Sequence, residues 1–115
     1  GARAPLKVST PAATVLDLIR YSSRVGGLSR AWETFSPFLS KIDPTGLRKA
    51  LEAEHEPALA QRLGYILERT ENVRLARAVA KWLPPNPPWA LLEPSAKASG
   101  GPRLERWRLF RNAEL

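Results

Sequence analysis

Residues 57–70 read Pro-Ala-Leu-Ala-Gln-Arg-Leu-Gly-Tyr-Ile-Leu-Glu-Arg-Thr and form an amphipathic helical pattern that opens on a proline. Apolar side chains recur three and four residues apart, which places on one helix face Leu59, Leu63, Ile66 and Leu67. Arg62, Tyr65 and Arg69 lie on a neighbouring face. Glycine costs about 1 kcal/mol relative to alanine inside a helix. Gly64 therefore predicts close packing of another helix or strand at that point.

The same period extends in both directions and predicts about five helices. Thr10-Pro11 and Asp43-Pro44 each place a capping residue before a proline, which is typical of a helix start. Gly26-Gly27 ends the first helix, and Pro37 predicts a break in the second, over residues 28–42. Asn72 is expected to cap a fifth helix over residues 73–83.

The remaining segments favour short strands. Residues 84–88, Pro-Pro-Asn-Pro-Pro, cannot continue a helix and are expected to form an extended, proline-rich connector. Residues 7–9, the apolar run 89–93 and the partly alternating residues 106–112 are candidate strands. The fold class is therefore α+β, with about five helices and two or three short strands near the chain ends, in a single domain over residues 1–115.

Composition excludes most enzyme chemistry. The 115 residues include no cysteine and one histidine, which excludes disulfides, cysteine zinc sites, thiol nucleophiles and histidine triads. Glu52, Glu54 and Glu56 flank His55, but side chains two residues apart on a helix point about 200° apart. That run favours a solvated helix end over a metal or acid–base cluster. We expect no enzymatic activity, no catalytic residue, no metal and no cofactor. The sequence shows no signal peptide and no apolar run long enough for a membrane span, so we expect a cytoplasmic protein.

The charge gathers at the chain ends. The net charge is +7, with +4 over residues 1–32 and +3 over residues 97–115, whereas residues 33–71 carry −2. If the first and last strands pair, Lys7 could join a phosphate-binding patch on one face, whose candidates are Arg20, Arg24, Arg103, Arg106, Arg108 and Arg111. A solvated surface, with arginine stems lying over apolar neighbours, explains the same residues equally well.

Two further patterns favour structural roles. Lys81-x-x-Pro84-x-x-Pro87 matches a proline-rich peptide ligand, but a linker between helix and strand explains it better. The four tryptophans favour core and edge packing over a base-stacking platform. From the residues alone, the chain is a basic, helical, non-enzymatic binding module.

The order of several sequence blocks resembles one family. The block Ser9-Thr10-Pro11-Ala12-Ala13-Thr14-Val15-Leu16-Asp17-Leu18-Ile19-Arg20-Tyr21, followed by Gly26-Gly27-Leu28, resembles the opening of the effector region of AbiEi-type antitoxins, the transcriptional-regulator half of type IV toxin–antitoxin systems. Later blocks that fit are Ile42-Asp43-Pro44, residues 60–68, Trp107-Arg108-Leu109 and Asn112-Ala113-Glu114. We expect the family-motif positions to define the fold: Thr10, Pro11, Asp17, Gly26, Gly27, Gln61, Gly64, Trp107 and Asn112.

The resemblance implies a function that the residues alone do not. It implies an antitoxin of abortive-infection type that represses its own operon through an N-terminal winged-helix domain, which this chain lacks. The present C-terminal domain would counteract a toxin of nucleotidyltransferase type without a stable complex, and would add basic contacts to operator DNA. The alternative is a protein-interaction module that uses an exposed helix face or residues 84–88. Binding to DNA would weaken steeply with salt, whereas binding of that second kind would not.

Overall fold

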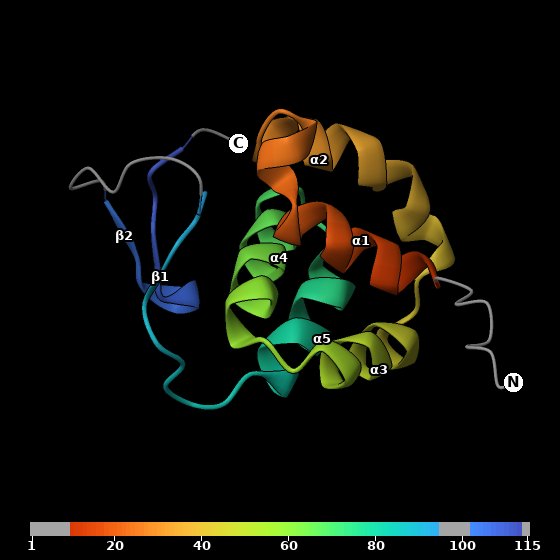
Figure 1. Cartoon of the computed structure of the whole chain (residues 1–115). Coiled ribbons are helices and arrows are strands. Elements are labelled where there is room, and N and C mark those ends of the chain that lie inside the picture. Colours follow the sequence, from red (N-terminus) through yellow and green to blue (C-terminus); the bar gives the residue numbers. More distant parts are fainter. Residues whose placement is uncertain (1–9, 95–101, 114–115) are drawn as a thin grey trace, which may run out of the picture.

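A computed structural model describes residues 10–94 and 102–113, and helices make up most of this part of the chain (Figure 1). The α-helices are α1 Pro11–Arg20, α2 Leu28–Phe35, α3 Pro44–Glu54, α4 Pro57–Arg69 and α5 Val73–Trp82. The 3-10 helices, labelled η, are η1 Ser22–Val25, η2 Ser36–Lys41 and η3 Glu105–Trp107. Three short strands complete the described fold: β1 Ala90–Leu91, β2 Arg103–Leu104 and β3 Leu109–Phe110. The expected α+β class with five helices is confirmed.

The two predicted cap-plus-proline starts are helix starts in the structure. Thr10 Oγ1 accepts a hydrogen bond from the backbone N–H of Ala13 at 3.1 Å, and α1 begins at the following proline. Asp43 Oδ1 accepts from the N–H of Gly46 at 2.6 Å, and α3 begins in the same way. Each side chain satisfies one of the N–H groups that a helix leaves unpaired in its first turn.

The predicted break at Pro37 is confirmed, but the first α-helix ends at Arg20, six residues before Gly26, and Gly26 instead caps the 3-10 helix η1. Gly26 and Gly27 take φ values of +98° and +103°, which side chains with a Cβ rarely adopt. The helix that begins after them ends two residues before Pro37 and continues as η2. Asn72 does precede α5, but its side chain donates to the carbonyl and hydroxyl oxygens of Thr70 and forms no cap bond to α5. The prediction that the side chain of Asn72 caps α5 was therefore wrong.

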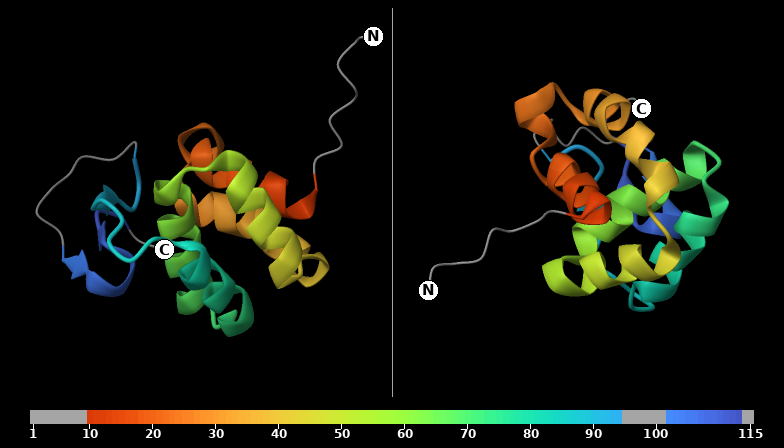
Figure 2. Two further views of the ribbon diagram at one scale, coloured as in Figure 1. Left: turned by 90° about the horizontal axis from the view of Figure 1, so that it is seen from below. Right: turned by 90° about the vertical axis from the view of Figure 1, so that its right-hand side faces the viewer.

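Helix α4 lies at the centre of the core (Figure 1, Figure 2). It packs against α1, α5 and η3. The buried residues of α4 are Leu59, Ala60, Gln61, Leu63, Gly64, Tyr65, Ile66 and Leu67. This set includes the whole predicted apolar face and extends beyond it, because neighbouring elements cover a central helix on more than one side.

Gly64 is the point at which the strand region meets α4. A Cβ placed on Gly64 would lie 2.6 Å from Cε3 of Trp107, closer than side chains tolerate. Trp107 is 2% exposed, and its indole Nε1 donates to Glu68 Oε1 at 2.8 Å. The close packing predicted from a mid-helix glycine is confirmed.

The strands form one mixed sheet in the order β1-β3-β2, beside α4 (Figure 1, Figure 2). β1 pairs parallel with β3, and β2 pairs antiparallel with β3. The central strand therefore has a neighbour on each side within the described residues. Residues 7–9, whose pairing with the last strand underlay the predicted basic face, lie outside the described residues.

The expected strand over residues 106–112 was wrong in its extent. The chain makes the 3-10 turn η3, and Arg108 then takes the left-handed conformation at φ 51°, so the chain reverses between β2 and β3. Trp107 and Leu109 are both buried, but they lie on a turn and a strand rather than on one continuous strand. Because the two buried residues are two positions apart, their spacing matched that of a strand.

No helix in residues 10–94 and 102–113 has the length and apolar character to cross a membrane.

Candidate functional site

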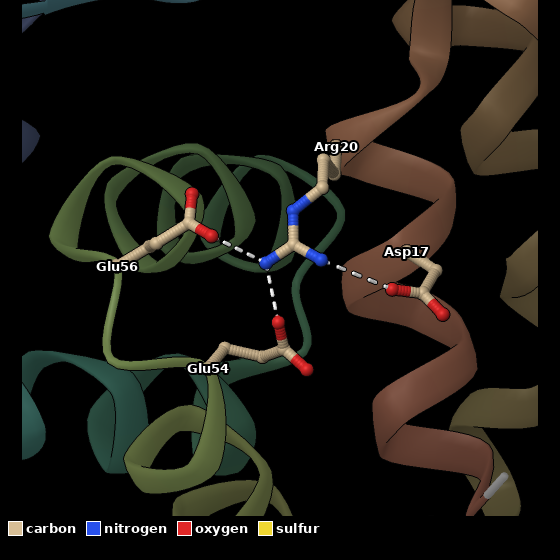
Figure 3. A network of polar contacts seen from close by, with 4 residues as sticks. All are labelled: Asp17, Arg20, Glu54 and Glu56. Atoms are coloured by element: carbon tan, nitrogen blue, oxygen red, sulfur yellow. Dashed lines mark hydrogen bonds and ion pairs between the residues drawn. The ribbon is translucent and has the colours of Figure 1, made fainter. Parts of the chain in front are cut away.

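The predicted phosphate ligand Arg20 lies among carboxylates. From the last turn of α1 its Nη2 contacts Glu54 Oε1 and, at 2.5 Å, Glu56 Oε1, while its Nη1 lies 3.4 Å from Asp17 Oδ1 (Figure 3). We call these four residues the Arg20 cluster. The hydrogen bond with Glu54 is the largest cause that raises the pKa of Arg20 above its ordinary value, burial opposes it, and Glu56 adds to it. The positive charge of Arg20 is therefore balanced inside the protein.

The convergence of Glu54 and Glu56 departs from the helical geometry expected for this run. Helix α3 ends at Glu54, and His55 takes the left-handed conformation at φ 54°. The chain turns there, so both carboxylates reach one guanidinium instead of pointing apart. Within the described residues, no group of three histidine, cysteine or acidic side chains is arranged to hold a metal ion.

A cavity of about 660 Å³ opens beside the Arg20 cluster, between α1, η2 and α3. Apolar side chains, most of them alanine, form part of its wall: Ala12, Ala13, Ile42, Ala50 and Ala53. Charged residues that also line it are Asp17, Arg20, Lys41, Asp43, Lys49 and Glu54. Its volume falls in the range of small-molecule sites, about 300–1,000 Å³. The charged lining has both signs, so the cavity has no simple preference for an anion or a cation.

Two of the candidate arginines meet on one indole ring. The guanidinium of Arg108 lies 5.5 Å from the ring centroid of Trp89, and that of Arg103 lies 5.8 Å from it. Phe110 packs against the same ring with centroids 5.2 Å apart, which accounts for an apolar side chain among arginines. Arg108 also donates to Asn86 Oδ1 at 3.2 Å. Arginine stacked on an indole keeps its charge and donors, so these two remain able to meet a phosphate.

The other candidate arginines lie elsewhere. Arg106 Nη1 pairs with Glu68 Oε2 at 2.9 Å and stacks 5.2 Å from the centroid of its neighbour Trp107. Arg24 lies 5.0 Å from the ring centroid of Tyr21, in the turn after α1. The backbone N–H of Arg111 donates to the carbonyl of Pro102 at 2.8 Å. The structure thus brings Arg103 and Arg108 together, and it places Arg20 in a separate acidic environment.

The family-motif positions take part in internal contacts. Gln61 Nε2 lies within hydrogen-bond distance of three carbonyl oxygens, those of Pro88 at 2.8 Å, Trp107 at 3.0 Å and Arg108 at 3.1 Å. The Asn112 amide forms a two-bond pair with the backbone of Glu93, at 2.8 and 2.9 Å. The Gln61 contacts attach the strand region to α4, and the Asn112 pair joins the segments that follow β1 and β3.

Sequence reasoning missed the buried side chain of Glu93. It is 5% exposed; its Oε2 accepts from the hydroxyl of Ser22 at 2.9 Å, and its Oε1 accepts from the N–H of Leu28 at 2.8 Å. Its sequence signal is an acidic residue directly after an apolar run. Arg62 was also missed as a polar link: its Nε donates to the carbonyl of Leu91 at 2.8 Å, and burial lowers its pKa, opposed by the charge of Glu93.

Comparisons with known proteins bear on the helical part of the chain. The model of a family described as the AbiEi antitoxin C-terminal domain matches residues 2–69. The matched range contains α1 to α4, and with them the Arg20 cluster and its cavity. Helix α5 and the three strands follow it. No curated protein and no solved structure matches the chain.

Proposed function

This chain belongs to the AbiEi antitoxin C-terminal domain family, and from that membership we propose that it counteracts a toxin of nucleotidyltransferase type. The family match over residues 2–69 is the observation that carries the proposal, and it supports an antitoxin role. In the proposed setting the domain belongs to a type IV system, acts in the cytoplasm, and accompanies a winged-helix domain that represses the operon. The chain itself performs no catalysis in this scheme.

The test is growth of a bacterial host that expresses the nucleotidyltransferase toxin encoded beside this gene. Coexpression of the 115-residue chain is expected to restore growth. Ile66→Asp is the matched negative control, because Ile66 is fully buried and an unpaired charge there should unfold the domain. Failure of the folded, abundant parent chain to restore growth, where the full-length protein succeeds, would overturn the proposal for this domain.

We propose in addition that the arginines of the strand region contact operator DNA. Support comes from Arg103 and Arg108, which share the Trp89 ring, and from the basic balance of residues 97–115. Arg20 is the weakest of the candidates, because a phosphate would have to displace Glu54 and Glu56.

The measurement for this second part is the salt dependence of DNA affinity. Each phosphate contact contributes about −0.9 to the slope of log affinity against log salt on duplex DNA. Replacement of Arg106, Arg108 and Arg111 by alanine should therefore make the slope shallower. An unchanged slope would remove these three residues from the interface.

A further inference from the structure

A second cavity, of about 360 Å³, lies between the start of α3 and the exposed side of α5, and its lining is strongly basic. Its cationic residues are Arg48, Arg74, Arg77 and Lys81, and its other lining residues are Pro44, Thr45 and Ala78. No acidic side chain from the described residues lines it. We call these seven residues the basic groove. Helices α3 and α5, which form it, lie side by side (Figure 1, Figure 2).

The protein does not neutralise the four cations of the groove. They are exposed, and in the part of the chain that the structure describes none of their side chains takes part in an ion pair or hydrogen bond. On α5, Arg74 and Arg77 are three residues apart, and Arg77 and Lys81 are four apart, so like charges lie next to each other and destabilise the helix. A negative charge fixed inside the groove would remove this repulsion.

Thr45 is the hydroxyl side chain of the groove, and it is exposed. It is the second residue of α3, in the first helical turn, where N–H groups lack intrahelical partners and the helix dipole favours a negative charge. Arg48 follows one turn later, on the same side of α3. Within the described residues the hydroxyl of Thr45 makes no hydrogen bond, whereas each of the other threonines uses its hydroxyl to bond a backbone group: Thr10, Thr14, Thr34 and Thr70.

We propose that Thr45 is a phosphorylation site and that the basic groove holds the phosphothreonine. A protein serine/threonine kinase supplies the phosphoryl group from ATP. Oγ1 of Thr45 forms a bond to the γ-phosphorus, the bond from that phosphorus to the β–γ bridging oxygen breaks, ADP leaves, and the hydroxyl proton passes through the kinase to solvent. A phosphothreonine forms about one to three charge-assisted hydrogen bonds when it lies at a helix N-terminus or opposite an arginine cluster. Thr45 meets both conditions.

The charges around Thr45 favour the phosphate. The phosphate brings about −1.5 to −2 into a groove of four cations, so the cations remain in excess. The carboxylate nearest in sequence belongs to Asp43, but its Oδ1 accepts from the N–H of Gly46 at 2.6 Å, and Asp43 lines the other cavity. Phosphorylation therefore links α3 to α5 and removes about half of the charge of this surface. This regulation goes beyond the proposed function, in which Thr45 has no part.

The test places a genetically encoded phosphothreonine at position 45 of the 115-residue chain and measures thermal melting by far-UV circular dichroism. The same phosphate is placed in two triple variants. R74A/R77A/K81A removes three cations from the groove, and R30A/K41A/R69A removes the same charge from exposed positions outside it. Because alanine favours helix and all six side chains are exposed, both variants are expected to fold.

Phosphorylation should raise the melting temperature of the parent chain by about 4 °C at low salt. The rise should fall to less than half in the groove variant, where the helix end and Arg48 remain, and stay complete in the control variant. Raising the salt concentration should reduce it. A rise of equal size in the groove variant, or no rise in the parent chain, would overturn the groove as the phosphate site.

A second modified chain controls for the phosphate itself. Thr34 is exposed and is the last residue but one of α2, where the helix dipole disfavours a negative charge. Phosphothreonine at position 34 should therefore leave the melting temperature unchanged or lower it. Equal rises at positions 34 and 45 would show a general effect of added negative charge on a basic chain and overturn the proposal.

Occupancy in the cell is measured on the chain recovered from its native host with the gene expressed. Trypsin cleaves after Lys41 and Arg48 and releases residues 42–48, in which Thr45 is the sole hydroxyl residue, so the mass of one phosphate group on this peptide assigns the site. Phosphate on this peptide supports the proposal. Detection of the peptide only in unmodified form would overturn Thr45 as a phosphorylation site.

Discussion

Gly64→Ala should change the sign of its effect on stability according to what stands at position 107. In the parent chain the new methyl group meets the indole of Trp107, whose Cε3 lies 2.6 Å from the position of a Cβ on Gly64. The ring cannot move aside freely, since it is 2% exposed and held by Glu68 through Nε1. In a Trp107→Ala background the same methyl group meets no ring.

The magnitude follows from two opposing effects. Overpacking a core costs about 1–3 kcal/mol, and alanine in place of glycine gains about 1 kcal/mol of helix propensity. The very short approach puts the overpacking cost near the top of its range. Gly64→Ala should therefore destabilise the parent chain by about 2 kcal/mol, and stabilise the Trp107→Ala variant by about 1 kcal/mol. The coupling between the two positions is then about 3 kcal/mol.

Urea unfolding followed by far-UV circular dichroism measures the four stabilities without depending on tryptophan fluorescence. Trp107→Ala alone should cost about 3–5 kcal/mol. Ala78→Gly, on α5, is the matched control, and it should cost about 1 kcal/mol in both backgrounds. A neutral or stabilising Gly64→Ala in the parent chain would refute the packing of the strand region on α4.

Other substitutions test the remaining contacts. Glu93→Gln should destabilise the domain by about 2 kcal/mol in urea unfolding, because an amide N–H₂ would face the donor groups that now bind the carboxylate; a loss below about 0.5 kcal/mol would contradict its burial. Arg20→Ala should lower the stability by about 1 kcal/mol at low salt and by less at high salt, because the Arg20 cluster is partly exposed and dissolved salt screens its charges. A loss of stability that does not depend on salt would argue against an ionic contribution. Because the raised pKa of Arg20 lies above that of unfolded arginine, deprotonation of Arg20 removes its stabilisation only above that ordinary value, so melting temperatures of parent and variant should differ by a constant amount between about pH 6 and 9. Thr10→Ala should lower stability by about 1 kcal/mol through loss of the α1 cap, and Thr10→Ser, which keeps the hydroxyl, should cost much less.

The helices could be predicted from the sequence because the residues that start and end them act over a few positions. Capping and proline positions act within one turn, so Thr10 and Asp43 could be placed before any tertiary contact was known. The strand region was harder to predict from the sequence. The alternation at Trp107 and Leu109 arises from burial on a turn and a two-residue strand, and a period of two cannot distinguish that from one continuous strand.

Functional surfaces depend on which elements pack together. Arg20 carries the same charge in the sequence as Arg77, but α1 packs near the end of α3, where Glu54 and Glu56 neutralise Arg20. Arg48 and Arg77 come from helices separated by α4 in the sequence, and they line one groove only because α3 packs on α5. Counting charge along the chain pointed to its ends, and it could not reveal this pairing.

The sequence by itself determined the helical framework, the turn at Gly26-Gly27, the close packing at Gly64 and, through the order of its motifs, the family. These features follow from short-range backbone preferences and from the space that a missing side chain leaves. Tertiary structure alone decided that Trp107 fills the space at Gly64, that Glu93 is buried, and that Arg20 is neutralised while Arg48 and Arg77 are not. Those outcomes depend on residues tens of positions apart, whose distances the folded chain sets and local preference does not.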